Sequence, residues 1–367
     1  MQRDSGSVTL KTSVQVEEED ISPQAKASSV DADDDALRAA CDPVASQIAV
    51  NRSITAPEQR LPPELLAEIF LHLQKRPSSM LELIELDRII ARVCTTWRHV
   101  VLGTPRLWSS INVHAQSDTV DAEKCLRRYL PLSRSCPLYI LCNTAGQPGL
   151  LPLLSEHASR WQHINLQISS AESRAMTPVA TPLLERAQVH VRDALDAEHP
   201  GLLRFLQYTP RLRVLAFKGQ SKEMAAKLSL PMSPVLVVLH LVLIDLLTSY
   251  SLTSVLPTIQ QYRKTLKTLT CGLGGAGPAA SESTQSAADE RIQFPALLWL
   301  AVFGAGLELF PRISTPKLLM LLVDTGPAIF PSVFLDFLER EPLNIRVLQL
   351  LYNCRACSET DITMLLR

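Results

Sequence analysis

The stretch LRVLAF, residues 212–217, carries apolar side chains at its first, fourth and sixth positions. Apolar residues that alternate with other residues over such a short run are typical of a strand with one buried face. The same pattern occurs seven more times, so the chain contains an internal repeat. The eight copies are WQHINL (161–166), LERAQV (184–189), LRVLAF (212–217), LVVLHL (236–241), LKTLTC (266–271), LLWLAV (297–302), LLMLLV (318–323) and IRVLQL (345–350).

The copies return at similar intervals, because their fourth residues lie 21 to 31 positions apart. A period of about 20–29 residues with this signature indicates leucine-rich repeats, in which one strand and one helix per repeat stack into a curved solenoid. Helix-like segments at 201–210, 252–262 and 334–341 separate some of the copies, and a weaker copy, CPLYILC at 136–142, precedes them. We therefore expect a degenerate leucine-rich-repeat-like α/β solenoid over residues 114–367. The alternative is an ordinary α/β domain with leucine-rich strands.

Residues 60–113 show the period of helices rather than that of strands. In LPPELLAEIF at 61–70 and just beyond, apolar side chains fall one, three and four positions apart, which places them on one helix face. Pro62 and Pro63 favour the start of this helix, since proline has a suitable φ for a first helical position and its missing N–H costs nothing there. The predicted apolar face consists of Leu65, Leu66, Ile69, Phe70 and Leu73.

Two more helical pieces are expected after the first. Ser79 and Glu82 have the spacing of a capping box at the start of the second piece. The third piece runs from Ile89 to Val100 with apolar residues every three or four positions, and the segment GTPRLW at 103–108 ends it. The pattern predicts an α+β chain, in which a three-helix module precedes an α/β domain.

Residues 61–113 resemble the F-box, and more narrowly the F-box-like module of a large fungal protein family. The resemblance rests on LPPELLAEIFLHL and VCTTWRHVVLGTPRLWSSINV, whose elements occur here in the family's order. The residues that match the family pattern are Leu61, Pro62, Glu64, Leu65, Leu66, Ile69, Phe70, Val93, Cys94, Trp97, Arg98, Pro105, Leu107 and Trp108. Because many elements match in order, the resemblance is more specific than a lone LPPE would be.

The resemblance implies a three-helix module that docks onto a Skp-type adaptor, which in turn holds a cullin scaffold. The repeats would then hold an unknown protein substrate, so the chain would be a substrate-recognition subunit of a Skp–cullin–F-box ubiquitin ligase. A non-ligase leucine-rich-repeat interaction scaffold is the alternative. The adaptor contacts that the resemblance implies are Leu61, Pro62, Glu64, Leu65, Ile69, Phe70, Val93, Cys94 and Trp97.

Residues between the apolar positions of each repeat are expected on the strand face, where repeat domains bind their partners. We expect Arg213, His240, Lys267 and Arg346 to occupy equivalent outward positions in different repeats and to contact the substrate. Apolar residues accompany these basic ones, and a mixed surface of this kind fits a protein ligand.

Residues 1–59 have the composition of a disordered acidic tail. Through Arg60 the chain carries 11 acidic and 6 basic side chains, a local net charge of −5. Such a segment has too little apolar area to offset the entropy of ordering it. The predicted organisation is therefore a tail at 1–59, an F-box at 60–113 and a solenoid at 114–367.

We expect no enzymatic activity, no cofactor and no metal site. CGLGGAGP at 271–278 contains a G-x-G-x-x-G, but a proline and a polar segment follow it where a dinucleotide site needs a helix. It is interpreted as a loop between repeats, and an enzyme that uses it is a third hypothesis. Cys354 and Cys357 form a C-x-x-C that lacks two further zinc ligands nearby.

The overall composition argues against binding to nucleic acid and against a membrane span. The formal net charge of −1 offers no electrostatic case for nucleic acid. The longest apolar run, Val235–Leu247, is shorter than the roughly 20 residues that a membrane span requires. The polar N-terminus lacks a signal-peptide pattern and the eight cysteines are scattered, so we expect reduced thiols in a cytoplasmic or nuclear protein.

Overall fold

The computed structural model describes residues 41–48, 61–74, 89–113, 119–144, 149–193, 201–220, 224, 228–231, 233–243, 252–274, 291–324, 332–340 and 344–351. The chain divides into two compact units, residues 1–62 and residues 63–367. No helix among these described ranges is long and apolar enough to cross a membrane.

In the first unit, residues 41–48 form a helix whose side chains are all exposed. These residues fall within the stretch 1–59 that is predicted to be a disordered tail, and the rest of that stretch lies outside the described residues. Because none of its side chains is buried, this helix depends on local propensity rather than on packing.

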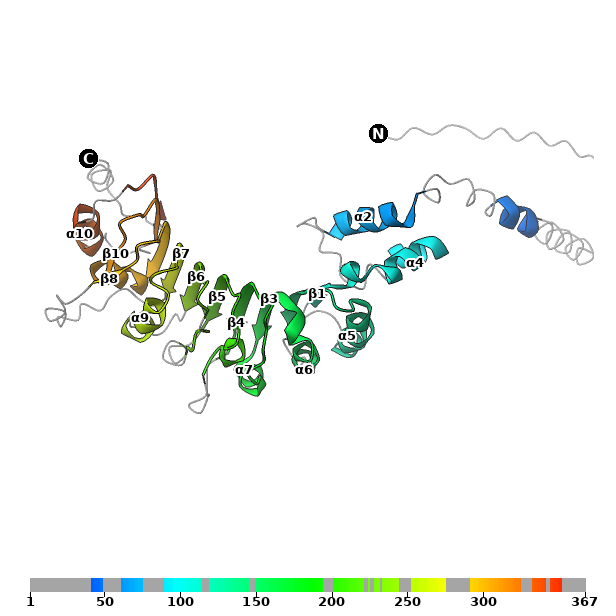
Figure 1. Ribbon diagram of the computed structural model, residues 1–367, viewed down its shortest axis with the longest axis horizontal. Coiled ribbons are helices and arrows are strands. Elements are labelled where there is room, and N and C mark those ends of the chain that lie inside the picture. Colours follow the sequence, from blue (N-terminus) through cyan, green and yellow to red (C-terminus); the bar gives the residue numbers. More distant parts are fainter. Residues whose placement is uncertain are drawn as a thin grey trace, which may run out of the picture. The chain divides into compact units, whose positions relative to one another are not determined.

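The second unit is built on one parallel sheet whose ten strands follow the order of the chain (Figure 1). Eight of the strands are the eight copies of the repeat, β2 is the weaker copy, and β1 is an additional strand that the repeat search missed. The strands are β1 (Ser110–Val113), β2 (Leu138–Asn143), β3 (Trp161–Ile168), β4 (Arg186–Val191), β5 (Val214–Gly219), β6 (Val238–Leu243), β7 (Thr268–Leu273), β9 (Trp299–Gly304), β11 (Met320–Asp324) and β12 (Val347–Leu351). The short strands β8 (Ile292–Gln293) and β10 (Ile313–Ser314) pair separately.

The pairing register places the fourth residue of every repeat in one continuous row. Each member is the direct partner of the next, from Ile111 on β1 to Leu348 on β12. All are buried except Leu348, which is half-buried. The members between the ends are Ile140, Ile164, Ala187, Leu215, Leu239, Leu269, Leu300 and Leu321. This row removes aliphatic side chains from water on nine neighbouring strands and therefore stabilises the sheet.

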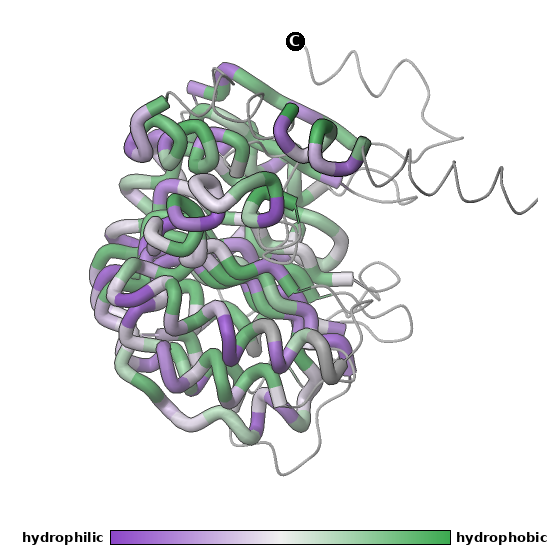
Figure 2. Tube along the Cα trace, turned by 90° about the vertical axis from the view of Figure 1, so that its right-hand side faces the viewer, coloured by the Kyte–Doolittle hydropathy of each residue, from purple (hydrophilic) through white to green (hydrophobic). Residues whose placement is uncertain are grey.

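Helices connect the strands along one side of the row, where α5, α6, α7 and α9 lie in Figure 1. Parallel neighbours require such crossovers, and the crossover elements bury the apolar side of each strand. Because each element has one buried and one outward side, hydrophobic and hydrophilic residues alternate along the chain in Figure 2. The crossover helices are α5 (Thr119–Leu132), α6 (Leu150–Ser155), α7 (Ser170–Ala175), α9 (Leu252–Gln260) and α10 (Ser332–Arg340), with the 3₁₀ helices η4 (Ala158–Arg160), η5 (Arg204–Leu206) and η6 (Ala305–Arg312).

Two of the three helix-like segments expected between repeats are helices, namely α9 and α10. The third, 201–210, contains only the single turn η5. Gly201 and Leu203 have φ values of 127° and 63°, which no right-handed helix includes, so the helix cannot extend in the N-terminal direction.

The residues ahead of the sheet form α2 (Pro63–Gln74), η2 (Ile90–Arg92), α4 (Thr95–Gly103) and η3 (Pro105–Trp108). Helix α2 begins at Pro63 and α4 ends at Gly103, as the proline and glycine signals predict. The predicted second helix falls at 75–88, outside the described residues. The predicted third helix is not continuous, because Cys94 is extended and its Sγ accepts a hydrogen bond from the Trp97 amide as the cap of α4.

Trp108 joins this helical region to the sheet. Its side chain is fully buried, its indole Nε1 donates to the Val101 carbonyl at 2.8 Å, and its ring lies 4.9 Å from that of Tyr129 on α5. The tryptophan therefore fixes α4 and the first crossover helix to each other rather than facing outward.

Candidate functional site

Helix α2 presents an apolar stripe to solvent. Leu65, Ile69 and Leu73 are spaced four residues apart, which aligns them along one side of the helix. Their side chains are 52%, 44% and 41% exposed. Two further aliphatic residues of this region, Ile89 and Val93, are also exposed. Large apolar side chains gathered on one short region mark a surface that a partner covers.

The neighbouring side of α2, about 100° round the helix, is the one that holds the helix in place. Leu66 and Phe70 are each 1% exposed, and the Phe70 ring meets the Trp97 ring edge to face with centroids 5.0 Å apart. The sequence predicts Phe70 as an adaptor contact, and its burial corrects that prediction. Successive residues of a helix rotate by about 100°, so a face that looks continuous in sequence spans both the buried and the open side.

The other predicted adaptor contacts differ in accessibility. Pro62, Glu64 and Val93 are exposed, whereas Leu61, Cys94 and Trp97 are half-buried. Trp97 also has a buried indole Nε1 without a hydrogen-bond partner among the described residues. The accessible part of the predicted contact set therefore lies on and just before α2, with Val93 preceding α4.

The predicted substrate contacts belong to two different positions of the repeat. Arg213, Lys267 and Arg346 lie immediately before their strands and share one row, here called the strand-start row. A ladder of backbone hydrogen bonds of 2.8–2.9 Å joins its members, each amide donating to the carbonyl of the preceding one. The row consists of Gln162, Glu185, Arg213, Val237, Lys267, Leu298, Leu319 and Arg346. His240 is not in this row, because it pairs with Ala216 and Thr270 inside the strands.

His240 is half-buried on the open side of the sheet. Its Nδ1 lies 2.7 Å from the Thr270 hydroxyl, and its ring lies 6.1 Å from that of Trp299. Burial lowers the pKa of the His240 imidazole from its ordinary value. The expectation that His240 is equivalent to Arg213 is therefore wrong. Arg213 is the second residue of its repeat motif and His240 is the fifth, so they occupy different register positions in the sheet.

The lowered pKa of His240 predicts a pH dependence of stability. An unfolded histidine titrates near pH 6.5, so below that pH the unfolded state binds a proton before the folded state does. The free energy of unfolding should therefore decrease as the pH falls through the window between 6.5 and the lower folded pKa. Urea unfolding across this range measures the slope, and His240→Gln should make it shallower. An unchanged slope in the variant would contradict this role, because His157, His163 and His190, whose pKa values are also lowered, would then account for all of it.

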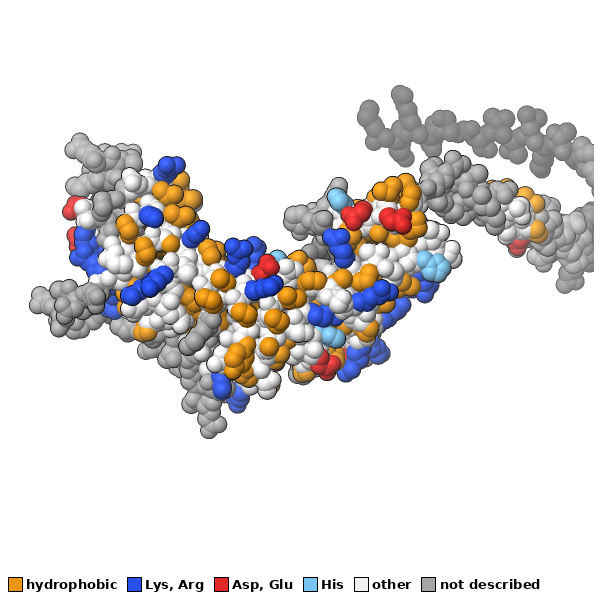
Figure 3. All heavy atoms as spheres, in the orientation of Figure 1, with side chains coloured by type: hydrophobic (Ala, Val, Ile, Leu, Met, Phe, Trp, Pro, Cys, Tyr) orange, Lys and Arg blue, Asp and Glu red, His pale blue; other side chains and the backbone are white. Residues whose placement is uncertain are grey.

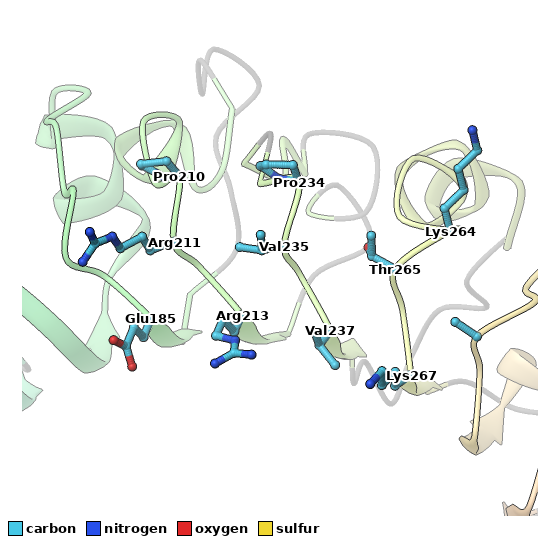
Figure 4. Close-up of a pocket in the computed structure, with 11 residues that line it drawn as sticks. Glu185, Pro210, Arg211, Arg213, Pro234, Val235, Val237, Lys264, Thr265 and Lys267 are labelled. Atoms are coloured by element: carbon cyan, nitrogen blue, oxygen red, sulfur yellow. The ribbon is translucent and has the colours of Figure 1, made fainter.

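A groove of about 620 Å³ lies along the strand-start row between β4 and β9 (Figure 4). We call it the strand-start groove. Its cations are Arg211, Arg213, Lys264 and Lys267, all exposed, and its one carboxylate is Glu185. Figure 3 shows the same mixture more widely, with hydrophobic side chains between Lys and Arg side chains on the face in view.

The outer edge of the groove comes from a second repeat that the sequence search overlooked. A Thr or Ser, a Pro, a variable residue and a Leu recur at 181–184, 209–212, 233–236 and 315–318. In each copy the leucine amide donates to the carbonyl of the first residue at 3.1–3.5 Å, which closes a turn that suits proline at its second position. The variable residues Arg211 and Val235 are thereby exposed beside the row. This short motif is the signal that could have found them.

The described part of the glycine motif at 271–278 does not have the geometry of a dinucleotide site. Gly272 lies inside β7, where an added Cβ would lie 3.4 Å from the Phe303 ring, so it is not the turn glycine of a dinucleotide site. Most of the following loop, 275–290, lies outside the described residues, as do Cys354 and Cys357. Within the described ranges no three His, Cys, Asp or Glu side chains are grouped to hold a metal ion.

Comparison with known proteins identifies one segment of the chain. No curated protein matches the chain. A family model does match the segment that contains α2, η2, α4, η3 and β1. The match confirms the resemblance to the F-box-like module, though not to its narrower fungal type, and indicates a protein-interaction role. Residues 59–114 of the chain are an F-box-like domain.

Proposed function

We propose that this protein is the substrate-recognition subunit of a Skp–cullin–F-box ubiquitin ligase. The F-box-like domain docks onto a Skp-type adaptor, and through it onto a cullin. The sheet domain is a degenerate leucine-rich-repeat solenoid that binds the target protein. The subunit performs no chemistry and acts in the cytoplasm or nucleus by holding its target close to the ubiquitin-charged enzyme.

The exposed stripe of α2 is the observation that carries this proposal. Leu65, Ile69 and Leu73 belong to the domain that matches the F-box-like family, and 41–52% of each side chain remains exposed in the isolated chain. Covering the exposed half of each one is worth roughly 0.7–1.5 kcal/mol. Three such anchors on a helix that Phe70 holds rigidly support tight docking, even after the cost of association.

The sheet supports the receptor half of the proposal. Its strands pair in chain order with one in-register row of buried aliphatic residues, which is the arrangement that stacked repeats produce. The crossover helices lie on one side, so the outward side chains of successive strands form a continuous surface. Such a surface suits an extended stretch of another protein.

A non-ligase interaction scaffold is the second candidate. It is favoured by the departures from the predicted contact set, since Phe70 is buried and Cys94 serves as a helix cap. Those departures leave a smaller accessible face, which a different helical partner could also cover.

Copurification of the full chain with a Skp-type adaptor and a cullin tests the proposal. A ligase subunit should recover both proteins in a stable complex, and should recover the cullin only when the adaptor is present. A folded chain that binds neither would contradict the ligase assignment. If it still captured other proteins, that result would favour the scaffold.

A further inference from the structure

We propose that the strand-start groove binds an extended acidic segment of a partner protein, in which two carboxylates three residues apart flank an apolar side chain. The inference deepens the proposed receptor function by naming the chemistry of the target, and it rests on that function. The established resemblance concerns only residues 59–114, so the groove stands on its own observations.

The charge of the groove is the first observation. Arg211, Arg213, Lys264 and Lys267 are exposed, and none of the four forms an ion pair with another described residue. Glu185 can offset only one of these four charges, and its carboxylate has polar neighbours on the β3 side. Gln162 Nε2 donates to one of its oxygens at 3.3 Å, and His163 Nε2 lies 4.0 Å from the other. The groove therefore presents an excess of unpaired positive charge.

The spacing of the cations is the second observation. Arg213, Val237 and Lys267 precede three adjacent strands, and backbone hydrogen bonds of 2.9 Å hold each one against the next. Two strand spacings place the backbones of Arg213 and Lys267 about 9.5 Å apart. A polyproline-II segment rises about 3.1 Å per residue with three residues per turn, so its residues i and i+3 face the same way about 9.3 Å apart. Acidic residues with that spacing can meet both cations at once.

An apolar strip between the cations is the third observation. Val237 lies directly between Arg213 and Lys267, and Val235 beside it is 42% exposed. Pro210 and Pro234 continue the strip along the outer edge, where Figure 4 shows them in line. An apolar residue between the two ligand carboxylates would cover these side chains. Glutamate alone would leave them in water.

This composition favours a peptide over a nucleic acid. Single-stranded nucleic acids bind where aromatic rings stack on the bases, and no described residue that lines the groove is aromatic. The four cations are also spread along the groove among valines and prolines rather than joined in one basic stripe. A carboxylate-bearing segment of a protein matches both the charges and the strip.

Binding of labelled peptides to the purified full chain, without adaptor, tests the proposal. The probe is a fluorescein-labelled Ser-Glu-Val-Pro-Glu-Ser peptide, with Ser-Gln-Val-Pro-Gln-Ser and Ser-Glu-Glu-Val-Pro-Ser as matched peptides. The first should bind at least about 10-fold more tightly than either control, because only it places two charges at the required spacing. Equal binding of all three peptides would overturn the proposal. Tighter binding of a uridine oligonucleotide would overturn it in favour of nucleic acid.

Charge reversals locate the binding on the molecule. Arg213→Glu with Lys267→Glu should weaken binding of the acidic peptide at least about 10-fold. The control is Arg346→Glu with Lys317→Glu near β11 and β12, which makes the same change of charge at one exposed strand-start cation and one exposed cation of a Thr-Pro turn, outside the groove. If both double variants lost the same amount of peptide affinity, the binding would depend only on the overall charge of the protein, and the proposed site would be wrong. Undiminished binding by the Arg213 and Lys267 variant would also overturn the site.

The adaptor assay keeps this inference separate from the proposed function. All variants are first compared with the parent protein in thermal melts, so that misfolded chains are recognised. A groove variant that loses the peptide but keeps the adaptor supports the inference. A parent protein that binds the peptide but no adaptor contradicts only the ligase assignment. A parent protein that binds the adaptor but not the peptide contradicts only the proposed peptide site in the groove.

Discussion

Replacing Leu65 and Ile69 with serine is expected to weaken binding of a Skp-type adaptor about 10- to 100-fold. Full burial of such a side chain is worth roughly 1.5–3 kcal/mol, and about half of each surface is still open to be covered, so the loss of both contacts costs about 1.5–3 kcal/mol of binding free energy. Because neither side chain belongs to the buried core, the melting temperature of the double variant should fall by only a few degrees. Titration of purified adaptor against both proteins, by calorimetry or surface binding, gives the two dissociation constants.

Glu68→Ser is the matched control, because it removes an exposed side chain from the same helix. Glu68 lies 3.7 Å from Arg106 in a surface ion pair whose loss costs little. Adaptor binding should therefore change only slightly in this control. An unchanged affinity in the Leu65 and Ile69 double variant would contradict docking through α2. Phe70 is left out of the test, since its replacement would disturb the packing on Trp97 and confuse docking with stability.

Leu269→Asp is expected to unfold the sheet domain at room temperature or bring it close to unfolding. Leu269 is fully buried and pairs with Leu239 and Leu300 in the central row. A carboxylate at that position has no partner and loses its hydration, which costs more than about 4 kcal/mol. That is a large part of the stability of an ordinary domain. Urea denaturation followed by far-UV circular dichroism measures the change.

Lys267→Asp provides the comparison, because it adds the same carboxylate two residues earlier at an exposed position. Its free energy of unfolding should remain within about 0.5 kcal/mol of that of the parent protein. If both aspartates were tolerated equally, the buried row could not be what stabilises the sheet. Lys267→Asp should also weaken binding of the acidic peptide, so this one variant should lose peptide affinity while it keeps its stability.

The positions of the strands could be predicted from the sequence because the pattern that encodes them is local. Each copy of the motif carries its apolar residues within six positions, and a strand of that kind can bury only one face. The eight copies therefore match the strands, and the weaker copy at 136–142 overlaps β2. β1 was missed because SINV at 110–113 follows the helical region directly and does not show the full motif.

The ends of helices could be predicted for the same reason, while the break at Cys94 could not. Pro63 and Gly103 act through their own backbone preferences, so they mark boundaries in any surroundings. Cysteine has no such preference. The extended backbone of Cys94 arises where η2 ends and α4 begins, and its Sγ then caps the new helix.

The sequence by itself determined which residues are apolar, at what period they recur, and that residues 59–114 form an F-box-like domain. Only the tertiary structure decided which apolar residues of α2 stay open. Leu65 and Phe70 have the same apolar character, yet Phe70 is buried against Trp97, a residue 27 positions away, and Leu65 remains 52% exposed. The tertiary structure also forms the groove, because parallel strand pairing brings Arg213, Val237 and Lys267 side by side although they lie 24 and 30 residues apart in the sequence. Such proximity is a property of backbone hydrogen bonding between strands, and no local pattern of side chains encodes it.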